Sequence, residues 1–133
     1  MAEGESVENS ADATVKVGRS VSKSVKDVWK LLVGKDGAEA LLGPGAFLGD
    51  KGDGWRSDDG KFGVVRSYHP LELIRFSWHA AEDQPKTVVE VLLTKVDDAT
   101  TQVDITHERV PEYYDTAKLA RRWEAALDRL AAA

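Results

Sequence analysis

The spacing of apolar side chains changes in the last third of the chain. In residues 89–93 and again in 103–107, every second side chain is apolar or histidine, which is the period of a strand with one buried face. After Pro111 the apolar residues recur at intervals of three and four, as on one stripe of a helix. The strand set is Val89, Val91, Leu93, Val103, Ile105 and His107, and the helix set is Thr116, Leu119, Ala120, Trp123, Ala126, Leu127 and Leu130. This pattern predicts a long helix packed on a sheet, an arrangement that can enclose a pocket.

The first forty residues predict a strand followed by two short helices. Apolar residues alternate over residues 15–21, and Ser24 then provides a helix N-cap. The stripe of the first helix is Val25, Val28, Trp29 and Leu32. We expect Gly34 and Gly37 to break this helix, and Ala38–Leu42 to form one or two further helical turns.

The middle of the chain predicts antiparallel strands. Residues 45–60 are rich in glycine and polar side chains, with short extended pieces expected around Phe47 and Trp55. Four longer strands follow, joined by turns too short for a parallel crossover. Their predicted bounds are Lys61–His69, Leu71–His79, Pro85–Val96 and Thr100–Val110.

Composition favours one soluble domain in the cytoplasm. A chain of 133 residues is long enough for a single core without disulfides, and it contains no cysteine. Residues 1–13 lack the features of a signal peptide, and no apolar run reaches the roughly 20 residues of a membrane span, so we expect no membrane insertion.

The formal charge of −5 is concentrated at the start of the chain. Four acidic residues lie in residues 1–13, which we expect to be a disordered leader before a domain at residues 14–131. The domain itself then carries about −1 and has no basic stripe, which argues against nucleic acid as a partner.

No motif for a metal or a cofactor is present. The three histidines lie on three different predicted strands without metal-ligand spacing. The acidic segment from Asp50 resembles a calcium loop, but it has glycines at its third and fifth positions and Lys61 at its twelfth. The glycines also match no phosphate-binding pattern. We therefore expect no metal and no cofactor.

Four segments in order resemble the SRPBCC (START-like) superfamily, in its chaperone-ATPase-activator-homologue branch. These segments are Ser24–Leu32, Leu73–Trp78, Thr100–His107 and Trp123–Leu130. The resemblance extends over residues 14–131. It implies an α+β helix-grip fold, in which a curved antiparallel sheet wraps around a long C-terminal helix, with two short helices after the first strand and a cavity between sheet and helix. Because the superfamily includes carriers, receptors, cyclases, hydrolases and co-chaperone domains, function depends on the site.

The inferred strand faces predict a pocket for a small, largely apolar molecule. Trp78 and Trp123 are expected to form opposite walls, and His107 is the polar group expected to orient the ligand. The full predicted lining is Phe76, Trp78, Val91, Ile105, His107, Leu119 and Trp123.

Several alternatives remain open at this point. His107 is a candidate catalytic acid or base of an enzyme acting on a hydrophobic substrate, or a core histidine with partners inside the protein. A co-chaperone-like domain that binds a protein partner is a third possibility. Trp55 either caps the cavity or anchors its loop. The charged residues Glu108, Arg109, Arg121 and Arg122 are explained by surface salt bridges, although an internal charge among them would point to function.

Overall fold

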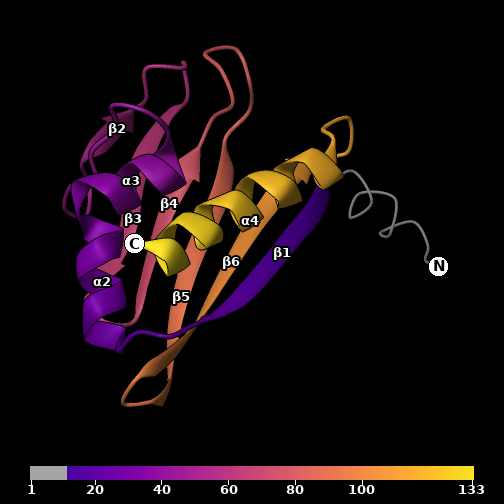
Figure 1. Cartoon of the computed structure of the whole chain (residues 1–133). Helices are drawn as coiled ribbons and strands as arrows, with labels where there is room; N and C mark the ends of the chain where they lie inside the picture. Colours follow the sequence, from indigo (N-terminus) through magenta and orange to yellow (C-terminus); the bar gives the residue numbers. More distant parts are fainter. Residues whose placement is uncertain (1–11) are drawn as a thin grey trace.

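The computed structural model describes residues 12–133, which form one six-stranded antiparallel sheet and three helices (Figure 1). The order of strands across the sheet is β1-β6-β5-β4-β3-β2. The elements are β1 (Asp12–Val21), α2 (Val25–Val33), α3 (Lys35–Leu42), β2 (Gly54–Arg56), β3 (Phe62–His69), β4 (Leu73–Trp78), β5 (Thr87–Asp97), β6 (Thr100–Pro111) and α4 (Thr116–Ala132). The curved sheet, the paired short helices and the long last helix confirm the α+β helix-grip fold.

One face of the sheet forms the core with α4. The helix lies across this face and contacts β1, β6 and the two short helices (Figure 1). The buried strand residues alternate as the sequence predicts: they are Ile74, Phe76, Trp78, Val89, Val91, Leu93, Val103, Ile105 and His107. The helix buries Leu119, Trp123, Ala126, Leu127 and Leu130 against them. From Leu119 onward the three-residue and four-residue spacing is therefore the contact stripe of α4, whereas Thr116, which the prediction included, is exposed and Ala120 is half-buried.

The two short helices begin and end largely as predicted. The Ser24 side chain accepts a hydrogen bond from the Asp27 N–H (3.1 Å), and Gly34 ends α2. The expected break at Gly37 is wrong, because Gly37 lies inside α3. A Cβ atom there would lie 1.9 Å from the Leu31 carbonyl oxygen, so glycine lets α3 approach the end of α2. None of the helices in residues 12–133 has the length and apolar character needed to cross a membrane.

Two differences from the prediction occur at the edges of the sheet. β1 already includes Asp12 and Ala13, which pair with Pro111 and Val110, so the strand takes in the end of the expected leader. The remainder of that leader lies outside the described residues. Phe47 is 73 % exposed and in no strand, whereas Trp55 lies in β2, which pairs with β3.

Gly63 allows β3 to pass close to β4, and its replacement by alanine is expected to cost about 1–3 kcal/mol in the free energy of unfolding. An added Cβ would lie 1.9 Å from the Ser77 carbonyl oxygen and 2.8 Å from the Trp55 indole nitrogen. That indole donates to the same carbonyl (3.1 Å), so the clash would also disturb the hydrogen bond. Urea denaturation measures the loss. Gly54→Ala is the control, because its nearest contact would be 3.7 Å, and an equal loss in both variants would contradict the explanation.

Candidate functional site

Four elements meet around His107 in a chain of buried hydrogen bonds. The Trp123 indole N–H on α4 donates to His107 Nδ1 on β6 (3.2 Å). His107 Nε2 lies 2.8 Å from the Thr87 hydroxyl on β5, which donates to the Trp78 carbonyl oxygen on β4 (2.6 Å). His107 and Thr87 have no exposed surface. The bonds therefore join α4 to three strands inside the core.

The partners of His107 determine its protonation. An indole N–H only donates, so Nδ1 carries no proton, and the neutral ring donates from Nε2 to Thr87. Burial, and secondly the positive charge of Arg122, lower the pKa of His107 from 6.5 to about 4. With both nitrogens engaged, the imidazole has no free nitrogen for a ligand in this arrangement, and the position is that of a satisfied core histidine.

Trp78 and Trp123 pack against each other, with no cavity between them. Their ring centroids are 6.3 Å apart at an interplanar angle of 65°, which is an edge-to-face contact. Each ring also packs edge-on against His107, with centroid distances of 5.0 and 5.6 Å. The space expected between the two indoles is filled by these contacts, because three large rings converge at one level of the core.

A pocket of about 440 Å³ lies beside this cluster, at the end of the sheet where α4 begins. Trp78, Ala80 and Leu119 form its apolar wall. Its polar lining comes from the turn before β3, the β4–β5 loop, the loop before α4 and α4 itself, and consists of Lys61, Gln84, Tyr114, Asp115, Lys118 and Arg122. This is the candidate site.

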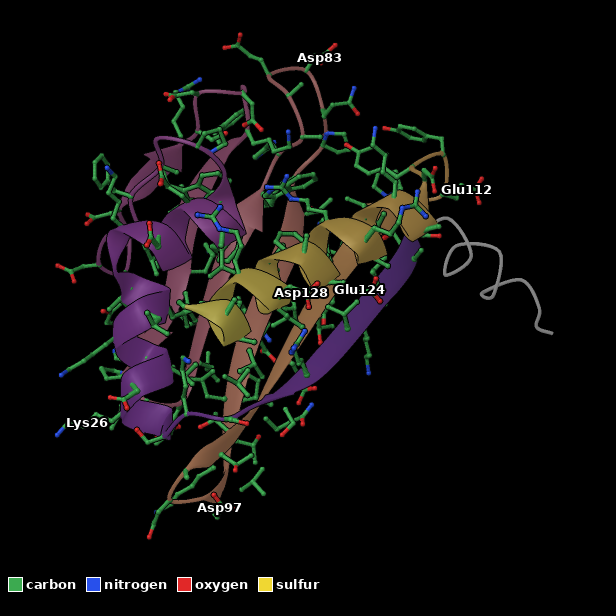
Figure 2. All side chains as sticks on the ribbon, viewed as in Figure 1. Lys26, Asp83, Asp97, Glu112, Glu124 and Asp128 are labelled. Atoms are coloured by element: carbon green, nitrogen blue, oxygen red, sulfur yellow. The ribbon has the colours of Figure 1, made fainter. Side chains whose placement is uncertain are left out.

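Two loops are joined at the edge of the pocket. The Tyr114 hydroxyl donates to Gln84 Oε1 (2.9 Å), and burial, followed by Tyr113 and Asp83, raises the pKa of this hydroxyl. The backbone carbonyl oxygen of Gln84 lies 3.0 Å from His79 Nδ1. Figure 2 shows Asp83 and Glu112 on these two loops, at the periphery of the molecule. The loops therefore hold a tyrosine hydroxyl and an amide at the site.

Arg122 is the charged residue most closely built into the pocket wall. Its guanidinium carbon lies 5.6 Å from the ring centroid of Trp78 and 5.2 Å from that of Trp123, within the range of cation–π contact. Burial lowers the pKa of this guanidinium, and Asp59 opposes the change. Among residues 12–133 no carboxylate forms a salt bridge with it. Among the charged residues that the sequence analysis left open, Arg122 is thus a half-buried charge in the pocket wall.

The predicted lining is divided between core and pocket. Trp78 and Leu119 line the pocket, whereas Phe76, Val91 and Ile105 are fully buried in the core and do not line it. Trp123 and His107 are also fully buried and support the pocket from inside. The binding role of the pocket residues stays a prediction. Three residues of the lining, Arg122, Tyr114 and Gln84, were not predicted from the sequence. Only Arg122 could have been found from the sequence, because it is adjacent to Trp123 on the helix stripe.

The other candidates have structural roles. Trp55 is 5 % exposed, packs edge-on against Phe76 and anchors β2. Trp29 packs against Tyr68.

Arg109 is exposed, and its φ of 62° falls where the pairing of β6 with β1 shifts register. The expected salt bridges of Glu108, Arg109, Arg121 and Arg122 do not form among residues 12–133. No cluster of three or more metal-ligating side chains occurs in this part of the chain.

The fold and the pocket at the start of α4 place the protein in the helix-grip class. The chain matches the model of the Activator of Hsp90 ATPase homolog 1-like proteins over residues 24–133, and it belongs to that family. No curated protein matches it.

Solved structures agree with this fold. Protein MLL2253 from Mesorhizobium loti superposes with a TM-score of 0.77 at 19 % identity, over 90 % of this chain and 95 % of that one. CalU16 from Micromonospora echinospora gives 0.74 at 21 %, over 88 % and 73 % of the two chains. The Aha1 protein of Colwellia psychrerythraea, solved as a dimer, gives 0.72 at 20 %, over 90 % and 93 %. At these identities the likeness concerns the fold.

Proposed function

We propose that the protein binds a small, largely apolar molecule in the pocket beside Trp78. The observation that carries this proposal is the pocket itself, where an indole and Leu119 form an apolar wall inside a ring of polar groups. Its volume of about 440 Å³ falls in the range of small-molecule sites. Such sites combine apolar surface, which supplies affinity, with a few polar groups that set orientation.

The other hollows lack this combination. One of about 460 Å³ lies over β1, β5 and β6, and its lining includes Lys16, Glu90 and Asp104 but no aromatic side chain. Another of about 270 Å³, between α3 and the end of α4, is lined mostly by small residues, leucines and two charged side chains. The pocket beside Trp78 therefore has the chemistry best suited to a ligand with an apolar body.

The proposal is tested with the neutral dye N-phenyl-1-naphthylamine. We expect its emission to rise on titration into the protein, with energy transfer from the tryptophans because Trp78 lines the site. Ala80→Trp places a large ring in the pocket wall and should reduce the affinity at least tenfold. Ala81→Trp is the matched control, because Ala81 is the next residue and lies outside the lining.

Two results would contradict the proposal. One is the absence of any binding to the unmodified protein; the other is an equal loss of binding in both tryptophan variants with their folds intact. Native mass spectrometry of the protein purified from its own host extends the test, since a retained small molecule identifies the ligand class directly.

A further inference from the structure

We propose that the ligand of this pocket carries an anionic oxygen group, and that Arg122 is the residue that binds it. The inference rests on the proposed function and specifies its ligand class: an apolar, preferably aromatic, body with a carboxylate or sulfonate group. The supporting observations are the stacking of the half-buried Arg122, its lack of an ion-pair partner, and the balance of charge around the pocket.

The guanidinium of Arg122 is positioned before any ligand arrives. It lies over the rings of both Trp78 and Trp123. The Trp123 indole is held by its hydrogen bond to His107, and the Trp78 ring is held by edge-on packing against His107 and Trp123. A guanidinium fixed on aromatic faces still presents donors at its edge. Because the group does not have to be ordered on binding, it loses little conformational entropy when it pairs with an anion.

The same group lacks an ion-pair partner. Within residues 12–133, no carboxylate lies within salt-bridge distance of Arg122, although burial disfavours its charge. The carboxylate of Asp59 favours the charged form of Arg122, but this carboxylate already pairs with Lys61 (3.2 Å). A partly buried, unpaired cation is costly for a folded protein. A ligand anion would offset that cost.

Two residues of the pocket wall also carry a buried donor without a partner. Arg122 Nε and Trp78 Nε1 have no hydrogen-bond partner among residues 12–133, although both atoms are buried. Trp78 is 2 % exposed, and both residues line the pocket. Neither nitrogen can accept a hydrogen bond, so the missing partner must be an acceptor. Both atoms are closed off from the pocket in this structure, so the donors available to a ligand oxygen are the terminal nitrogens of the Arg122 guanidinium, which lie outside this buried pair.

The charges around the pocket also favour an anionic ligand. Its lining contains the cations Lys118 and Arg122, together with Lys61, whose charge is paired with Asp59, but only one carboxylate, Asp115. That carboxylate is engaged as the N-cap of α4, where it accepts from the Lys118 backbone N–H (3.1 Å). The whole chain carries −5, so the pocket is locally positive on a negative protein. This contrast selects anionic ligands over cationic ones.

A pair of dyes with the same aromatic body tests the inference. 8-Anilinonaphthalene-1-sulfonate carries a sulfonate that N-phenyl-1-naphthylamine lacks. Arg122→Met should weaken binding of the sulfonate about 10- to 100-fold, the loss expected for a charged hydrogen-bonded pair, while changing the affinity for the neutral dye less than threefold. Arg121→Met is the matched control: Arg121 is the adjacent arginine, exposed and outside the lining, and its removal should change neither affinity.

Three outcomes separate the two proposals. Binding of the neutral dye with no measurable binding of the sulfonate overturns the anion preference and leaves the pocket function intact. Equal weakening of both dyes by Arg122→Met, with an unchanged melting temperature, assigns Arg122 a structural role and also overturns the inference. Failure of both dyes to bind the unmodified protein removes the proposed function itself. Rescue of sulfonate binding by Arg122→Lys to within tenfold supports recognition through charge.

Discussion

Replacing Trp123 by alanine is expected to lower the free energy of unfolding by about 3–5 kcal/mol. Trp123 has no exposed surface and lies at the centre of the buried stripe of α4. Its ring packs edge-on against Trp78 and His107, and its indole N–H satisfies His107 Nδ1. Alanine would leave a cavity between helix and sheet, and would also leave a buried acceptor without a partner.

Two variants separate these contributions. Trp123→Phe retains most of the apolar volume but removes the N–H, so its loss should be about 1–3 kcal/mol. Ala125→Gly changes an exposed position on the same helix and measures the helix propensity alone, at about 1 kcal/mol. Chemical denaturation gives all three values. A loss below about 1 kcal/mol for Trp123→Ala would show that α4 does not pack through this residue.

Acid is expected to destabilise the protein through His107 by about 3 kcal/mol as the pH falls from 6.5 to about 4. In this window the unfolded chain binds a proton on the imidazole and the folded protein does not. Stability therefore decreases as the pH falls through the window, and the loss is complete below the folded pKa. The physical reason is that a buried imidazolium would be desolvated, and its Nδ1–H would face the Trp123 N–H, donor against donor.

The measurement is the free energy of unfolding against pH for the unmodified protein and for His107→Gln. Glutamine has a donor and an acceptor but does not titrate, so the difference between the two curves isolates His107 from the carboxylates. His69→Gln, which removes a histidine at an exposed position, is the matched control variant. A nitrogen NMR titration gives a second readout: we expect Nδ1 to stay unprotonated at pH 5, and protonation at pH 6 or above would contradict the assigned tautomer.

The elements and their buried faces could be predicted from local pattern. Alternation placed Val91, Ile105 and His107 on the inner face, and all three are fully buried. The spacing around Trp123 correctly marked the stripe of α4. Ser24 correctly marked the start of α2. These features follow from the geometry of a single strand or helix turn, so a linear sequence contains them.

The wrong prediction of a helix break at Gly37 shows that local sequence patterns do not report contacts between helices. A glycine in a short segment is a good sign of a helix end, but here it lies inside α3 because the neighbouring helix passes too close for a side chain. That proximity depends on how two helices pack, which residue types alone do not specify. The extra residues of β1 are a similar case, since Asp12 and Ala13 are extended through pairing with the end of β6.

The sequence by itself determined the inner face of each long strand and the contact stripe of the last helix, because each depends on a short-range period of apolar side chains. The order of these elements, with the family resemblance of four segments, also determined the fold class. Only the tertiary structure decided where the pocket lies. The distance between Trp78 and Trp123 depends on the side-chain volumes of β4, β5, β6 and α4 together, and these fill the space where a cavity was expected. The free volume lies instead beside Trp78, where two loops and the first turns of α4 meet and bring Arg122 to the wall. These residues come from distant parts of the chain, so their proximity exists only in the folded protein.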